Sequence, residues 1–80
     1  MLINDEYFRS NDLALVTALS LDFKILGTEK KDDSRIIFLF ENNADLSAYV
    51  ARYWRGEIFI NPIKYFNQIK VIKTRIYSLI

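Results

Sequence analysis

The segment Leu13–Leu21 is apolar almost throughout, and only Thr17 and Ser20 interrupt it. The stretch Ser10-Asn11-Asp12, just before it, supplies N-cap chemistry, because a short polar side chain there accepts a hydrogen bond from a free backbone N–H. Asp12 also suits the positive end of the helix dipole. We therefore predict a helix over residues 12–21. A helix that is apolar nearly all the way round has to be buried on more than one side. We expect it to lie between a sheet and another helix, or in a contact between subunits.

The chain has 80 residues, so its core is marginal unless it is rich in apolar side chains. It is 51% hydrophobic, whereas disorder requires low hydrophobicity and high net charge. We predict one domain over residues 1–80, with a loose N-terminal arm at 1–6. The arm is acidic and lacks the apolar core of a signal peptide, and no apolar run could span a bilayer. We expect a cytoplasmic protein with no membrane partner.

Two runs of strand-forming residues lie in the middle of the chain. The first covers residues 23–30, and the second, 35–40, is apolar on both faces, as central strands are. Between them, residues 31–34 include Asp and Ser, whose side chains support turns, so the two runs are predicted to form a hairpin. Short strands are also predicted at 7–9 and 57–60.

Two further helices are predicted after the hairpin. Asn42 is expected to cap a helix over residues 43–55, and Gly56 to end it. Asn61 is expected to cap the last helix, and Pro62 fits its first turn because the missing N–H has no helical partner there.

The predicted order is β-α-β-β-α-β-α, which belongs to the α+β class. The first six elements match the ferredoxin-like split βαβ plan, to which a C-terminal helix is added. A β-hairpin packed on three helices is the alternative, because the first and last predicted strands are short.

The chain contains no cysteine and no histidine. It therefore lacks thiolate chemistry, the commonest general base and the commonest metal ligand. Gly27 and Gly56 are isolated, whereas a phosphate-binding loop needs clustered glycines. The adjacent acids Asp32 and Asp33 lie in a predicted turn, where solvated carboxylates are far commoner than a catalytic pair. We expect no enzyme activity, no metal, no cofactor and no small-molecule substrate.

The last helix carries four cationic side chains and no acidic one. Its predicted core stripe is Tyr65, Ile69, Ile72, Ile76, Leu79 and Ile80. Beside that stripe lie Phe66, Lys70, Lys73 and Tyr77, and on the far side of the core Lys64, Gln68, Val71 and Arg75. The cations could meet phosphates while the rings stack on bases. Alternatively, the rings border the core and the cations form a solvated face.

Charge is distributed unevenly along the chain. Residues 1–51 carry five basic and nine acidic side chains, whereas residues 52–80 carry six basic side chains and Glu57 alone. This asymmetry favours an anionic partner for the second part, or attraction between the two parts within the fold. The net charge of only +1 counts against a dedicated nucleic-acid binder.

Trp54 has arginines on both sides, a composition typical of an interface hot spot and also of a residue that closes a small core. The surplus of apolar residues favours a protein partner, either a second copy or a host protein. We predict a protein-interaction module (homodimer, adaptor or inhibitor) with the interface residues Trp54, Arg55, Phe66 and Tyr77. The alternative is a nucleic-acid-binding module that uses Arg52, Lys64, Lys70, Lys73 and Arg75.

Several motifs follow one another with a characteristic spacing: YFRSNDLAL at 7–15, YWRGE at 53–57, Pro62 with Tyr65, Phe66 and Lys70, and KTRIYS at 73–78. Together they resemble a family of very small bacterial and phage proteins of unknown function. The resemblance implies no activity. It implies a setting in bacterial chromosomes and mobile elements, where small proteins often bind DNA or inhibit a host protein, and it suggests that Arg75 and Tyr77 do more than pack.

Overall fold

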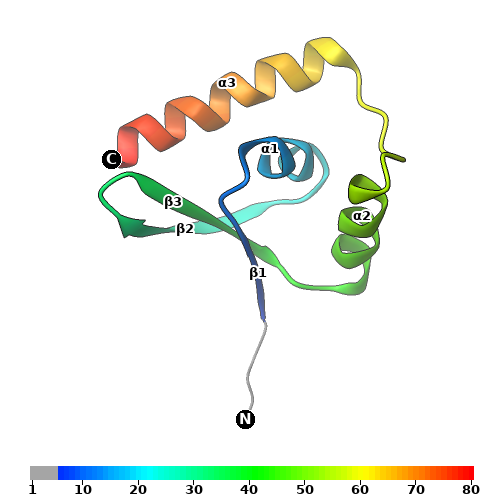
Figure 1. Ribbon diagram of the computed structural model, residues 1–80, viewed down its shortest axis with the longest axis horizontal. Coiled ribbons are helices and arrows are strands. Elements are labelled where there is room, and N and C mark those ends of the chain that lie inside the picture. The colour runs from blue at the N-terminus through cyan, green and yellow to red at the C-terminus, as the bar shows by residue number, and fades with distance from the viewer. Residues whose placement is uncertain (1–5) are drawn as a thin grey trace.

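The structure is a computed structural model that describes residues 6–80. Apart from Glu6, the predicted N-terminal arm lies outside the described residues. The α+β class is confirmed (Figure 1). The strands are β1 (Tyr7–Ser10), β2 (Ile25–Asp32) and β3 (Arg35–Glu41), and the helices are α1 (Leu13–Asp22), α2 (Ala44–Trp54) and α3 (Pro62–Leu79).

The sheet has β3 at its centre, paired antiparallel with β1 on one side and β2 on the other. β1 and β2 are therefore parallel to each other, and α1 connects them across the inserted β3. This is the split βαβ unit that the ferredoxin-like plan predicts.

The strand predicted at residues 57–60 is wrong. These residues lie in the segment between α2 and α3 and join no strand, so the order of the described elements is β-α-β-β-α-α. Their apolar alternation has another cause. Ile58 and Ile60 pack against the core while Phe59 points into solvent, so the side chains alternate without any backbone pairing.

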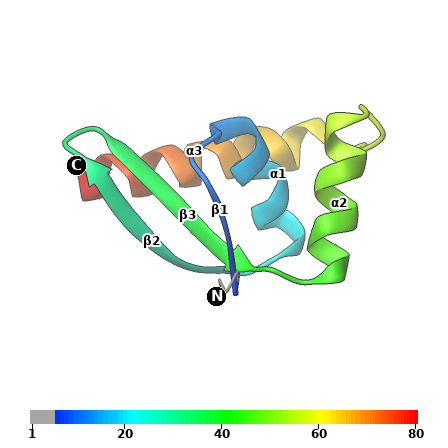
Figure 2. The same cartoon turned by 60° about the horizontal axis from the view of Figure 1, so that its bottom comes forward.

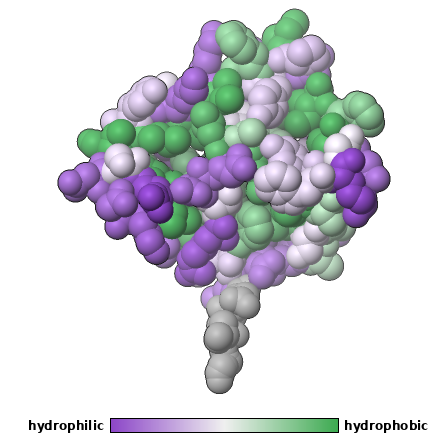
Figure 3. Space-filling view, in the orientation of Figure 1, coloured by the Kyte–Doolittle hydropathy of each residue, from purple (hydrophilic) through white to green (hydrophobic). Residues whose placement is uncertain are grey.

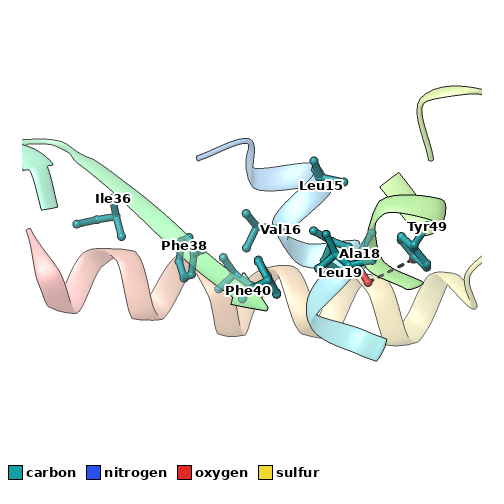
Figure 4. Packing of buried hydrophobic residues seen from close by; sticks show 10 residues of the cluster. Leu15, Val16, Ala18, Leu19, Ile36, Phe38, Phe40 and Tyr49 are labelled. Carbon is teal, nitrogen blue, oxygen red and sulfur yellow. Dashed lines mark hydrogen bonds between the residues drawn. The ribbon is translucent and has the colours of Figure 1, made fainter. Parts of the chain in front are cut away.

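Within residues 6–80, helices cover one face of the sheet and not the other. α1 and α3 lie on the same side of the sheet, as Figures 1 and 2 both show. Ile36, Phe38 and Phe40 of β3 are buried toward the helices (Figure 4), whereas Ile37 and Leu39 point the other way and are half-buried. This is the period of two expected of a strand, and it places the core between the sheet and the helices.

α1 is the most buried element of the described chain. Every residue from Leu15 to Leu19 is buried, and the helix contacts both α2 and α3. Even the buried Thr17 is satisfied, because its hydroxyl donates to the carbonyl oxygen of Leu13 at 2.7 Å. The prediction that this helix is enclosed on several sides is confirmed.

Helix caps were predicted correctly for two helices of three. Asp12 accepts a hydrogen bond from Leu15 N, and Asn61 accepts from the first turn of α3. The predicted cap Asn42 is wrong: Asn43 caps α2, accepting from Leu46 N at 2.9 Å. The backbone N–H of Asn42 instead donates to the carbonyl oxygen of Glu6, which holds this residue beside the sheet.

Gly56 ends α2 as predicted. Its φ of +74° lies in the left-handed region, which glycine adopts without the steric cost that other residues meet there.

Two tyrosines tie the outer helices to α1. Tyr49 of α2 donates to the carbonyl oxygen of Ala18 at 3.4 Å (Figure 4), and Tyr65 of α3 donates to that of Ala14 at 3.1 Å. Burial raises the pKa of both hydroxyls above the usual value of about 10. The carboxylate of Asp22 in α1 also raises the pKa of Tyr49, and that of Asp12, the cap of α1, also raises the pKa of Tyr65.

These raised pKa values predict a loss of stability in alkaline solution. The unfolded chain releases the Tyr65 proton near pH 10, while the folded chain holds it to a higher pH. The stability that the protonated Tyr65 hydroxyl contributes is therefore fully present below pH 10 and is lost as the pH rises through the pKa of Tyr65 in the folded chain. Tyr65→Phe should lower the free energy of unfolding by about 1 kcal/mol at neutral pH and make the alkaline loss shallower.

Urea unfolding followed by circular dichroism at a series of pH values measures both effects. Tyr77→Phe is the matched control, because the Tyr77 side chain is exposed and forms no hydrogen bond among residues 6–80. An alkaline loss that is equally steep in Tyr65→Phe and in the unmodified chain would contradict the prediction.

Candidate interaction surface

α3 touches the core along one stripe. Ile72 is buried, and Tyr65, Ile69 and Ile76 are half-buried, as predicted. The predicted core residues Leu79 and Ile80 are exposed instead. With 18 residues α3 is about 27 Å long, whereas the 10 residues of α1 span about 15 Å, so the last turn of α3 extends beyond the helix on which it packs.

Gln68 was predicted on the far side of the core, and that prediction is wrong. Its side chain is half-buried, and its Nε2 donates to Ser20 Oγ of α1 at 2.9 Å. Ser20 Oγ donates in turn to the carbonyl oxygen of Thr17. This polar chain is part of the α1–α3 contact, in which Tyr65 also donates to the carbonyl oxygen of Ala14.

A second stripe of α3 faces solvent. We call Ile63, Phe66, Lys70, Lys73 and Tyr77 the outer stripe. Its apolar members are largely exposed: Ile63 to 71%, Phe66 to 59% and Tyr77 to 69%. Phe66 and Tyr77 are eleven residues apart, which places them within about 20° of each other around the helix axis. Hydrophobic and hydrophilic side chains are intermixed on the surface over α3 in Figure 3.

Within this stripe, Lys70 lies against Phe66. Its Nζ is 4.3 Å from the ring centroid, a cation–π contact. Phe66 and Lys70 were predicted as neighbours in a stripe where rings and cations alternate, and this contact joins the two. Ile63 was missed at the sequence level, although it lies three residues before Phe66 and so continues the same spacing.

The structure does not gather the predicted nucleic-acid residues on one face. Lys64 and Lys73 are nine residues apart, or two and a half turns, so they point to opposite sides of α3. Arg75 lies on the side of Lys64, while Arg52 belongs to α2. Among residues 6–80, no acidic side chain forms an ion pair with any of these four cations or with Lys70.

Trp54 and Arg55, predicted at the interface, lie at the end of α2 and not on the outer stripe. Trp54 is 63% exposed, with its ring edge-on to Tyr53, so it does not close the core. Arg55 is bound to Glu57 at 3.0 Å. The structure thus brings Phe66 and Tyr77 together on α3 and leaves the other two interface candidates on another helix.

A further exposed ring follows Trp54 along the chain. Phe59 is almost fully exposed. Its exposure was not predicted, because its segment was expected to pair as a strand. A hollow of about 180 Å³ is lined by Leu21, Asp22, Phe59, Ile60, Asn61 and Lys64. It lies between the end of α1 and the start of α3.

An ion pair crosses the open face of the sheet. Arg9 of β1 and Glu29 of β2 lie on either side of β3, and their side chains meet at 3.4 Å. Their register partners on β3 are Leu39 and Ile37, so the pair lies over the half-buried apolar side chains of that face. About half of each charged side chain remains exposed.

A larger hollow of about 350 Å³ lies beside the sheet and is lined by Glu6, Tyr7, Leu26, Glu41 and Asn42. Among the residues that the structure describes, the charged groups of this lining are the carboxylates of Glu6 and Glu41, and no basic side chain belongs to it. Residues 6–80 contain no group of three or more side chains suited to hold a metal ion. Within that range, no helix has the length and apolarity needed to cross a membrane.

Comparison with known proteins places the chain in a sequence family. A family model described as a domain of unknown function (DUF5659) matches residues 5–78, nearly the whole chain. No curated protein and no solved structure matches. The match agrees with the expected resemblance to a small family of unknown function.

The cross-sheet ion pair gives a prediction about the open face. A double-mutant cycle of Arg9→Gln and Glu29→Gln should show a coupling of about 0.2–1 kcal/mol in the free energy of unfolding. The coupling should shrink as salt is added, because both groups are half exposed. The same cycle on Arg35 and Asp32, 4.0 Å apart near the hairpin turn, is the control and should show less. Equal coupling in both cycles would contradict the prediction.

Proposed function

The chain belongs to the DUF5659 family, and we propose that this domain of unknown function is a small, non-enzymatic protein-interaction module. We place it in the cytoplasm of a bacterium, encoded by the chromosome or by a mobile element such as a phage. The bacterial and phage setting rests on the resemblance described above, and the cytoplasm on a composition without cysteine, which suits a reducing compartment.

One observation carries the proposal: the outer stripe keeps three large apolar side chains in solvent on one side of α3. Isolated exposed apolar residues are common on protein surfaces. Here they recur at helical spacing on a rigid helix, so a partner could cover them together. Burying one such side chain contributes about 1.5–3 kcal/mol to association before the costs of binding are subtracted.

Nucleic-acid binding is the second candidate. It is supported by the four cations of α3, which have no acidic partner among the described residues. The divergence of Lys64 and Arg75 from Lys70 and Lys73 counts against it, because a phosphate backbone that follows the helix would meet only one pair at a time.

Affinity capture from a bacterial lysate in moderate salt tests the first candidate. The unmodified chain should retain a partner in a salt-tolerant complex, and Phe66→Ser/Tyr77→Ser should retain at least about tenfold less, since the apolar contact is lost. Val71→Ser is the matched control, because Val71 is 56% exposed on the same helix but lies off the outer stripe. Thermal unfolding verifies that each variant remains folded.

Retention of mixed-sequence DNA at low and moderate salt tests the second candidate. DNA binding that weakens steeply with salt, together with no salt-tolerant partner, would overturn the interaction module and support nucleic-acid contact.

A further inference from the structure

We propose that the outer stripe of α3 docks a single amphipathic helix of another protein, with apolar side chains against Phe66 and Tyr77 and carboxylates against Lys70 and Lys73. This inference rests on the proposed interaction function and specifies the chemistry of the partner.

The spacing of the outer stripe points to a helical partner. Its five residues follow one another at intervals of three, four, three and four, the repeat along which two helices pack at a crossing angle of about 20°. Residues on the stripe therefore recur about every 5 Å along the axis, close to the repeat of another helix. One face of a strand repeats at nearly 7 Å instead. From Ile63 to Tyr77 the stripe runs for about 21 Å, roughly four turns.

The charges of the stripe specify what the partner carries. Lys70 and Lys73 lie in its middle, and apolar side chains lie at both ends. Neither lysine forms an ion pair with any acid among residues 6–80, and Lys70 only rests on the ring of Phe66. A docked helix would cover both ammonium groups, and a covered charge is costly unless a group of opposite charge pairs with it. The partner helix therefore brings carboxylates to its middle and apolar residues to its ends.

A second copy of this chain does not meet that requirement. Two α3 helices aligned along the full stripe place lysine against lysine in either direction, and α3 has no acidic residue to compensate. Like charges brought together in this way cost several kcal/mol. α1 is buried, and α2 offers one carboxylate, Asp45, on a helix that also carries Arg52. The partner is therefore a different protein.

A synthetic helical peptide of about four turns is the probe, with leucines placed to face Phe66 and Tyr77 and glutamates to face Lys70 and Lys73. Binding to the full chain is followed by backbone amide chemical shifts and by calorimetry. We expect saturable binding, with the shifts concentrated on α3. A matched peptide that has lysines in place of the glutamates should bind at least about tenfold more weakly.

Charge reversal on the protein provides the sharper test. Lys70→Glu/Lys73→Glu should no longer bind the acidic peptide and should bind the lysine peptide, because glutamates on α3 then pair with the lysines of the peptide. Lys64→Glu/Arg75→Glu changes the net charge equally on the other side of α3 and should leave the preference for the acidic peptide unchanged. The proposal is overturned if neither peptide binds, if both bind equally, or if the two double variants behave alike. DNA binding that depends equally on all four cations would overturn it as well.

Lysate capture with the same variants distinguishes a failure of the acidic-helix proposal from a failure of the proposed interaction function. A partner lost on Phe66→Ser/Tyr77→Ser but retained on Lys70→Glu/Lys73→Glu would preserve the interaction module and overturn the acidic helix. A partner that Lys64→Glu/Arg75→Glu retains, but that the Phe66/Tyr77 and Lys70/Lys73 double variants both lose, supports the interaction module and the acidic helix together.

Discussion

The whole arrangement depends on burying α1. A ten-residue helix that is apolar on every side is stable in water only when neighbours cover all of those sides. The sheet, α2 and α3 each cover part of it, and Tyr49 and Tyr65 add hydrogen bonds from the two outer helices to α1 carbonyl oxygens. Because these contacts meet on one helix, the packing of each outer element depends on the packing of the others.

The interaction surface follows from the same packing. α1 is shorter than α3 and occupies only one side of it, so Phe66, Lys70, Lys73 and Tyr77 on another side of α3 remain exposed. The core stripe around Ile72 fixes α3 in place, and this turns Phe66 and Tyr77 outward on a rigid support. A helix backbone that is already fixed loses little conformational freedom on binding, which favours a specific partner over nonspecific association.

Parts of the candidate site could be predicted from the sequence, and other parts could not. The stripe of Phe66, Lys70, Lys73 and Tyr77 was recognised correctly, because a period of 3.6 residues determines which side chains share a side of a helix. The exposure of Trp54 was not predictable, since a Trp beside arginines is equally compatible with core and surface. The position of Gln68 also depended on a partner distant in sequence, the Ser20 hydroxyl of α1.

The sequence by itself determined the helices, two of their caps and the central hairpin. Capping, glycine termination and hydrophobic period act within a few residues, so Asp12, Asn61 and Gly56 could be interpreted without any knowledge of the fold. Only the tertiary structure decided that residues 57–60 form no strand, that the helices of the described chain cover a single sheet face, and that the last turn of α3 extends beyond the core. Those outcomes depend on which surfaces meet across long stretches of chain, and local patterns contain no information about such distant partners.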